Sequence, residues 1–286
     1  MRLASDRWSS WDGQVGLELG SRRAYVREGG LVEVVRLGEG EPIVMVGGLA
    51  GGWSLLAPLA LRLSREHEVI LCGLRGDLRS VMSRSVASID DMARDLGWVI
   101  RELGLESPTL LGVSFGAAIA LELAAQAPAC LDRLIVHGVE ARFQQRLGSR
   151  IARHVLERYA LPTDNAFVNQ FFRLLFGKGV PPGAALDFVI ERCWATDPLE
   201  IAHRLRLLEE FDLTGRLDRV QTPTLVIAGE RDVVVPPERQ KALADSLDQG
   251  EFTILPQAGH VGFVTHASAF ARVVREFVNA PVTAFR

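Results

Sequence analysis

A serine flanked by glycines lies in the sequence Gly-Val-Ser-Phe-Gly at residues 112–116. A serine hydroxyl becomes a good nucleophile only when a base takes its proton, and that base needs an acid to fix its tautomer. His260 and Asp232 are candidates for the base and the acid. Together with Ser114 they form a residue set that catalyses acyl transfer, provided that the fold brings the three side chains together.

The segments on either side of Ser114 predict a sharp turn between two regular elements. Residues 108–113 form a continuous apolar run, typical of a strand covered on both faces, and residues 115–125 predict an alanine-rich helix. Such a turn exposes a serine at the tip of a strand, and its glycines let neighbouring backbone come close. The positive end of the helix dipole then lies beneath the reacting oxygen. The alternative is a serine that only caps the helix.

Asp232 and His260 each follow a predicted strand, residues 224–228 and residues 252–255 respectively. The carboxyl ends of parallel strands meet at the same edge of a sheet, so these side chains are expected on the same edge as Ser114. The chain order of serine, acid and histidine agrees with this arrangement. Glu140, which follows another predicted strand, is the alternative acid.

Short apolar runs alternate with helical patterns along most of the chain. This alternation predicts an α/β fold with a mostly parallel eight-stranded sheet, helices on both faces and an antiparallel start. The predicted strands are residues 24–26, 31–37, 42–46, 68–72, 108–113, 131–137, 224–228 and 252–255. Helices are expected at residues 53–63, 89–103, 115–125, 238–247 and 270–278.

One long segment, residues 140–211, contains helical patterns and no good strand. We expect it to form a helical cap, or lid, over the carboxyl end of the sheet, because insertions that carry function emerge there. Residues 1–139 and 212–286 would then form the core domain. The alternative is an additional helical layer that packs elsewhere on the sheet.

Several motifs together resemble the α/β-hydrolase superfamily, specifically its lidded esterase and C–C hydrolase-like members, from about Tyr25 to Val278. The motifs are Gly-Gly-Leu-Ala-Gly-Gly-Trp at 47–53, Arg-Gly-Asp-Leu-Arg-Ser at 75–80, the serine turn, residues 223–232 and Ala-Gly-His at 258–260. The resemblance implies an α/β-hydrolase fold and an oxyanion hole made by the backbone N–H groups of Leu49 and Phe115.

Two positions depart from that family pattern. Gly47 stands where many members have a histidine, and Gly73 stands where an aspartate often precedes the Arg-Gly turn. The replaced side chains usually support loops, so we expect their loss to affect the rigidity of the loops that carry Gly47 and Gly73 more than the chemistry.

Aromatic and apolar residues of the cap predict an apolar or aromatic substrate. The candidate pocket residues are Gly48, Trp53, Phe171, Phe172, Trp194 and Val261. Packing of the cap onto the sheet is the alternative for most of them. Arg192 and Arg204 could pair with a substrate carboxylate or lie on a solvated face.

The composition excludes several other classes of protein. A net charge of −3 and a pI near 6.1 give no electrostatic reason for binding nucleic acid or membranes. Three widely spaced cysteines suit a reducing compartment, and the first 20 residues lack the apolar core of a signal peptide, so we expect a cytoplasmic protein. We expect no metal and no cofactor, and the sequence leaves monomer and homodimer open.

These observations predict a serine hydrolase that cleaves an ester or lactone of a small, largely apolar molecule through an acyl-enzyme. C–C bond hydrolysis of a diketone-like substrate is the next alternative, since the same triad and lid serve it. A ligand receptor and a cofactor-free oxygenase are alternatives from other classes. A dehalogenase or epoxide hydrolase is disfavoured, because these need an aspartate where Ser114 stands.

Overall fold

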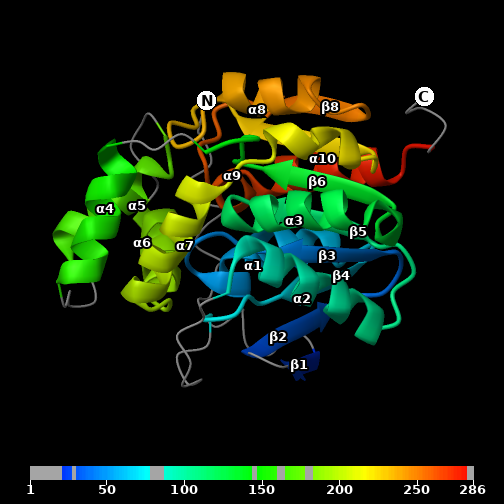
Figure 1. Ribbon diagram of the computed structural model, residues 1–286, viewed down its shortest axis with the longest axis horizontal. Helices are drawn as coiled ribbons and strands as arrows, with labels where there is room; N and C mark the ends of the chain where they lie inside the picture. Colours follow the sequence, from blue (N-terminus) through cyan, green and yellow to red (C-terminus); the bar gives the residue numbers. More distant parts are fainter. Residues whose placement is uncertain are drawn as a thin grey trace.

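In the computed structural model, the chain forms one mixed β-sheet (Figure 1). Its eight described strands lie in the order β1-β2-β4-β3-β5-β6-β7-β8, which confirms the predicted sheet. The residues that the structure describes are 21–27, 30–77, 87–143, 147–159, 165–177 and 183–281. The strands are β1 (Ser21–Arg27), β2 (Gly30–Leu37), β3 (Pro42–Val46), β4 (Glu68–Cys72), β5 (Thr109–Val113), β6 (Arg133–His137), β7 (Thr224–Gly229) and β8 (Gly250–Leu255).

The sheet begins as an antiparallel hairpin and continues as a parallel sheet. β1 pairs with β2, and β2 with β4, in antiparallel register, whereas all pairings from β4 across to β8 are parallel. From β3 the chain forms β4 on one side and later β5 on the other. Ligands of open α/β sheets bind outside the carboxyl ends of the strands at such a reversal of strand order.

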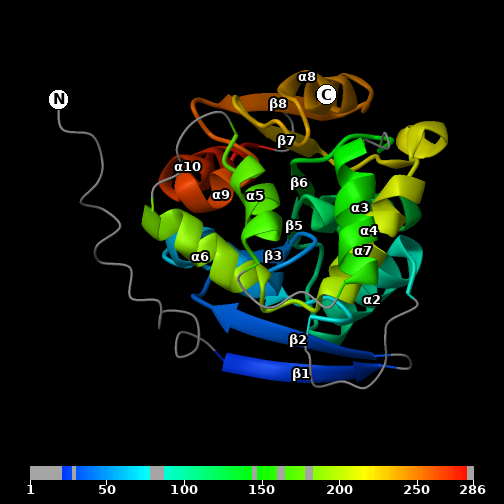
Figure 2. The ribbon, with the colours of Figure 1, turned by 90° about the vertical axis from the view of Figure 1, so that its left-hand side faces the viewer.

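Helices cover both faces of the sheet, because successive strand residues point to opposite sides. Ile43 and Met45 of β3 pack with helices α1 (Ala57–Leu63) and α10 (Ala267–Val278). Val44 and Val46 pack with helices on the other face. Those helices are α2 (Ile89–Glu102), α3 (Phe115–Gln126) and α8 (Pro237–Asp245). Figure 2 shows α10 and α3 on opposite sides of the sheet.

The helix expected at residues 53–63 is divided into two elements. Gly52–Leu56 forms a 3-10 turn, η2, and α1 begins only at Ala57. Pro58 lies in the first turn of α1, where the missing N–H of proline costs no helical hydrogen bond. The remaining short elements are η3 (Pro128–Cys130), η4 (Thr214–Arg219) and α9 (Gly262–Thr265).

Four of the described α-helices lie between β6 and β7 in the chain. They are α4 (Leu147–Arg158), α5 (Ala166–Leu174), α6 (Gly183–Cys193) and α7 (Pro198–Glu210). Figure 1 shows them grouped at one end of the sheet, and Figure 2 looks onto that end. Phe172, Trp194 and Ile201 join the same apolar cluster as Val113 and Ile135 of the sheet. The four helices therefore share a continuous core with the strands.

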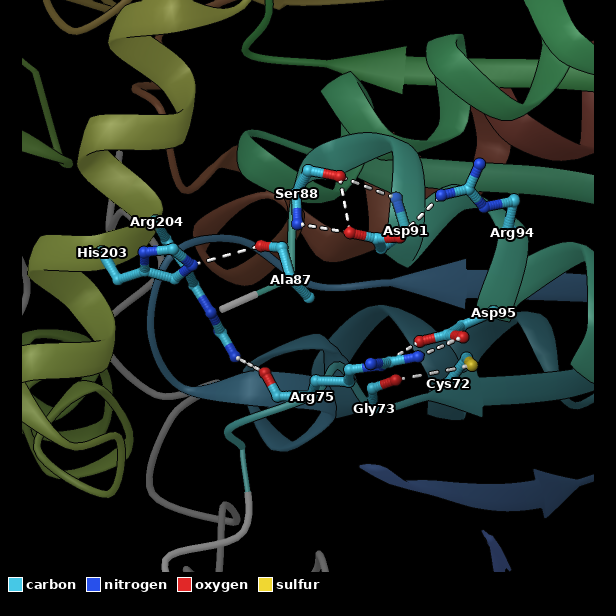
Figure 3. Close-up of polar contacts among 10 residues, drawn as sticks. All are labelled: Cys72, Gly73, Arg75, Ala87, Ser88, Asp91, Arg94, Asp95, His203 and Arg204. Carbon is cyan, nitrogen blue, oxygen red and sulfur yellow. Dashed lines mark hydrogen bonds and ion pairs between the residues drawn. The ribbon is translucent and has the colours of Figure 1, made fainter. Parts of the chain in front are cut away.

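Ser88 caps the beginning of α2 through a reciprocal pair of hydrogen bonds (Figure 3). The backbone N–H of Asp91 donates to the Ser88 hydroxyl at 3.1 Å, and the backbone N–H of Ser88 donates to the Asp91 carboxylate at 3.0 Å. This pattern satisfies N–H groups that the start of a helix otherwise leaves unpaired. The backbone of Ser88, followed by Arg94, lowers the pKa of Asp91 to about 2.

We expect Ser88→Ala to lower the free energy of unfolding by about 1 kcal/mol, because the N-cap hydrogen bond is lost. Urea denaturation followed by circular dichroism measures the change. Ser64→Ala is the matched control, since the Ser64 hydroxyl makes only a 3.4 Å contact with the Leu61 carbonyl at the end of α1. An equal loss in both variants would contradict a specific role of the Ser88 cap.

Candidate active site

Ser114 occupies the turn between β5 and α3 in a strained backbone conformation. Its φ is 54° and its ψ is −118°, a combination that residues other than glycine rarely adopt. All five residues of β5 are buried, as is α3 from Phe115 to Ala125, so packing on both sides holds the turn. The backbone N–H of Ser114 also donates to the carbonyl of His137 at 2.7 Å. The turn places Ser114 at the carboxyl end of a central strand.

Gly116 lets α3 approach the end of β3. A Cβ at this position would lie 2.3 Å from the carbonyl oxygen of Gly47 and 2.5 Å from that of Val46, so no other residue fits. The loop that follows β3 consequently runs beside the serine. A Cβ built on Gly48 would lie 3.4 Å from the Cβ of Ser114 and 3.9 Å from its Oγ.

Leu49 lies in this loop, and Phe115 is the first residue of α3. Within the described part of the chain, neither of their backbone N–H groups donates to another backbone group. Unpaired N–H groups near a nucleophile are the donors that stabilise an oxyanion in acyl transfer. We call residues 47–53 the oxyanion loop, after the role that we propose below for the N–H of Leu49.

His260 pairs with Asp232, and both side chains are buried. Nδ1 of His260 lies 2.8 Å from Oδ2 of Asp232, while the backbone N–H groups of Val234 and Val235 donate to Oδ1 at 2.8 and 2.9 Å. Burial raises the pKa of Asp232, but His260 and these hydrogen bonds outweigh it and lower the pKa overall. A charged carboxylate only accepts, so Nδ1 carries the proton and leaves Nε2 as the base.

Gln240 supports this pair from α8, a role that the sequence analysis did not assign. Its fully buried side-chain amide donates to Oδ2 of Asp232 at 3.2 Å and to the Val235 carbonyl at 2.7 Å. Its side-chain oxygen accepts from the backbone N–H of Gly138 at 2.8 Å. A Cβ on Gly138 would lie 2.6 Å from Cε1 of His260, so this backbone packs directly against the imidazole. A polar residue on the apolar face of α8 is the only sequence signal for Gln240.

His137 lies beneath the His260 loop, as a core residue. Its Nδ1 is 2.7 Å from the Ile227 carbonyl oxygen and its Nε2 is 2.7 Å from the His260 carbonyl oxygen. Burial, followed by the nearby charge of His260, lowers the pKa of His137. A neutral imidazole has one N–H and can donate to one of the two carbonyls, whereas a protonated ring could donate to both.

Glu140, the alternative acid, pairs elsewhere. Its Oε2 accepts from Nη1 of Arg239 at 2.9 Å. Of the two acids considered from the sequence, Asp232 is the one that is hydrogen-bonded to His260.

A cavity of 370 Å³ opens beside Ser114 and His260, which both line it. Five of the six residues expected in a pocket lie on its wall, namely Gly48, Phe171, Phe172, Trp194 and Val261. Trp53, the sixth, is not among the described residues that line this cavity. Its side chain is buried away from the cavity, and its indole N–H donates to Oε2 of Glu33 at 2.7 Å.

The rest of the wall is mostly aliphatic, with contributions from α4 and α7, but it also contains Phe143, Phe263, Ser149 and Cys193. It includes Val155, Leu156, Ile201, Leu205 and Leu208, with Val233 and Val234 beside the acid. No Asp, Glu, Lys or Arg is among the described residues that line the cavity. Arg192 lies off the wall, and Arg204 is fully buried rather than solvated. The cavity therefore suits an uncharged, apolar ligand.

The described ranges hold no cluster of three His, Cys, Asp or Glu side chains that could bind a metal ion. Among the helices that the structure describes, none is both long enough and apolar enough to cross a bilayer.

Known proteins resemble this chain over most of its length. It is 27% identical over 246 residues to a protein named as a carbamate hydrolase from Pseudomonas savastanoi pv. phaseolicola, covering 83% of this chain and 93% of that protein. It is 26% identical over 255 residues to a pimeloyl-acyl-carrier-protein methyl ester esterase from Nitrosospira multiformis, covering 85% and 96%. A thermophilic esterase from Thermogutta terrifontis superposes with a TM-score of 0.79 at 25% identity, covering 90% of this chain and 98% of the esterase.

A family model assigns the fold independently. Residues 41–267, well over half of the chain, match the model described as the alpha/beta hydrolase fold. The matched range contains all of β3 to β8, Ser114, Asp232 and His260. The chain therefore belongs to the α/β-hydrolase fold family.

Proposed function

We propose that this protein is a serine hydrolase that cleaves neutral, apolar esters or lactones through an acyl-enzyme. One observation carries the proposal: Ser114, in its strained turn, and His260, paired with Asp232, line the same apolar cavity. The named esterases and hydrolases among its relatives support the same reaction class.

In the first half of the reaction, Nε2 of His260 takes the hydroxyl proton while Oγ of Ser114 attacks the ester carbonyl carbon. The carbonyl electron pair moves onto oxygen, and the N–H groups of Leu49 and Phe115 stabilise that charge. The intermediate collapses, the C–O bond of the ester breaks, and His260 returns its proton to the leaving alkoxide. The alcohol departs and Ser114 keeps the acyl group.

In the second half, a water molecule replaces the alcohol. His260 removes a proton from the water, whose oxygen attacks the acyl carbon in the same oxyanion hole. Collapse releases the carboxylic acid and returns the proton to Ser114. Asp232 stays ionised and stabilises the imidazolium that forms in both halves.

We further propose that residues 140–211 act as a cap that determines which acyl or alcohol groups enter. Residues of this segment, on helices α4 to α7 and beside them, supply most of the apolar wall of the cavity. The Leu175 carbonyl, just after α5, accepts from the backbone N–H of Val261 at 3.1 Å, so the cap also contacts the loop of the base. We also place the protein in the cytoplasm, since its three cysteines are unpaired.

Labelling with a fluorophosphonate tests the proposed reaction class. The reagent phosphonylates an activated serine, and peptide mass mapping identifies the residue. We expect one adduct on the peptide that contains Ser114. An unlabelled protein, or an adduct on another serine, would contradict the proposal.

A series of p-nitrophenyl esters tests the substrate class. We expect kcat/KM to rise about fourfold per added methylene until the cavity is filled, because burying each CH₂ contributes about 0.8 kcal/mol. The hemisuccinate ester, which carries a carboxylate, should react at least about 100-fold more slowly than the butanoate, since an unpaired charge in an apolar cavity is costly. All the esters share one leaving group, which controls for its reactivity. A preference for the anionic ester would favour a diketone-acid C–C hydrolase instead.

A further inference from the structure

Arg204 makes contacts that its position on α7 did not suggest. Its side chain is fully buried, and Nη1 donates to the carbonyl oxygen of Leu49 at 3.1 Å. Nη2 donates at 2.8 Å to the carbonyl oxygen of Arg75 (Figure 3) and at 2.8 Å to Oδ1 of Asp77. Nε donates to Oε1 of Glu200 at 3.1 Å. One side chain therefore joins α7 to the loops that follow β3 and β4.

The same guanidinium also touches the other proposed oxyanion residue. Its central carbon lies 5.8 Å from the centroid of the Phe115 ring, within the range of a cation–π contact. Arg204 thus contacts both residues, Leu49 and Phe115, whose N–H groups are the proposed oxyanion donors.

The charges around Arg204 indicate that its hydrogen bonds contribute more to the position of the oxyanion loop than to the free energy of unfolding. A buried guanidinium loses its hydration, and Asp77 and Glu200 compensate for that loss. Well-packed apolar side chains in place of such a buried ion cluster are often equally stable. What an apolar side chain would not supply is the directed hydrogen bond to the carbonyl of Leu49.

The oxyanion loop needs such a support from outside. It begins with Gly47 and Gly48, which have no side chains to anchor it. A second anchor comes from the segment between α6 and α7. Thr196 is buried there, and its Oγ1 accepts from the backbone N–H of Gly51 at 3.0 Å. Both anchors belong to the inserted helical segment.

We propose that Arg204 and Thr196 are positioning residues, through which the inserted helices hold the oxyanion loop in its catalytic geometry. The inference rests on the proposed acyl-enzyme mechanism. Arg204 holds the carbonyl of Leu49, and Thr196 holds the N–H of Gly51. With β3 holding the other end of the loop, these two hydrogen bonds fix the direction in which the Leu49 N–H points. That N–H acts on the charge of the transition state, so its displacement lowers kcat and leaves substrate binding nearly unchanged.

The test compares Arg204→Met and Thr196→Val with the wild-type protein on one p-nitrophenyl ester. A trifluoromethyl ketone with the same acyl chain is the transition-state probe, because Ser114 adds to its carbonyl carbon and places the charge on the carbonyl oxygen. We expect kcat of Arg204→Met to fall about tenfold or more, less than the roughly 100-fold loss of a whole oxyanion donor. KM should stay within about twofold, and the inhibition constant of the ketone should rise by the same factor as kcat falls.

His203→Ala is the matched control on the same helix. Its Nε2 contacts the carbonyl oxygen of Ala87 at 3.2 Å and so docks α7 on the core without touching the oxyanion loop (Figure 3). We expect it to keep wild-type kcat and ketone affinity. The inference would be overturned if Arg204→Met kept wild-type kcat and wild-type ketone affinity, or if only its KM changed. An equal loss of kcat in His203→Ala would also overturn it.

Thr196→Val keeps the test decisive if Arg204→Met does not fold, since it removes a single neutral hydrogen bond. We expect a smaller loss of kcat, about threefold, and again a KM close to that of the wild-type protein. Wild-type kcat and ketone affinity in this variant would then overturn the inference. A wild-type protein that neither hydrolyses esters nor binds the ketone would overturn the proposed function itself, whereas an active wild type with unaffected variants overturns only the positioning role.

Discussion

Ser114→Ala is expected to lower kcat on a p-nitrophenyl ester by roughly 10⁴- to 10⁶-fold, because the acyl group then has no nucleophile to bond with. The residual rate comes from substrate binding and the oxyanion donors acting on water. Alanine keeps the Cβ of the serine and lacks only its Oγ, so the substitution should leave the fold of the strained turn intact.

Stopped-flow and steady-state absorbance at 405 nm, with about micromolar enzyme, would measure so large a loss. Ser149→Ala is a matched control, since Ser149 lies on the wall of the same cavity but belongs to α4. We expect it to keep kcat within about threefold, as for other changes away from the reacting atoms.

Fluorophosphonate labelling distinguishes the two serine variants directly. Ser149→Ala should be labelled at the wild-type rate, and Ser114→Ala should not be labelled. Equal ester turnover by Ser114→Ala and the wild-type protein would remove Ser114 from the mechanism and leave only the fold assignment.

Asp232→Asn is expected to lower kcat by about 10⁴-fold with little change in KM. In the wild-type protein, the carboxylate accepts a hydrogen bond from Nδ1–H at 2.8 Å, which leaves Nε2 unprotonated and able to act as the base. An asparagine amide can donate to Nδ1 instead, which moves the proton to Nε2 and leaves His260 unable to accept one from Ser114. It also removes the negative charge that stabilises the imidazolium.

Glu140→Gln is the control for this variant, because it neutralises the other acid considered from the sequence. Glu140 is paired with Arg239 at 2.9 Å, so we expect kcat to stay within about threefold of wild type. Assays of both variants against pH at a fixed ester concentration check the assignment. A larger loss of kcat in Glu140→Gln than in Asp232→Asn would transfer the role of the acid to Glu140.

The sequence alone determined the sheet and the positions of the serine and histidine. The strands β3 to β7 are short, largely apolar runs, and such runs are typical of strands that are buried on both faces of a parallel sheet. Parallel pairing through helical crossovers then brings the loops after β5, β7 and β8 to one edge, whatever their separation in the chain. The sequence alone therefore predicts that Ser114, Asp232 and His260 lie at the same edge of the sheet.

Only the tertiary structure decided which side chains face one another across that edge. An amphipathic helix indicates which residues are buried but not what they contact, so Trp53 was assigned to the pocket although it packs against Glu33. Gln240 and Arg204 show the same limit, since their partners at Asp232 and Leu49 lie on other elements. Hydrogen bonds depend on distances of a few tenths of an ångström between remote segments, and packing of the whole chain sets those distances. The support of the Gly47-Gly48 loop by Arg204 is therefore a property of the folded chain, which no local pattern in the sequence indicates.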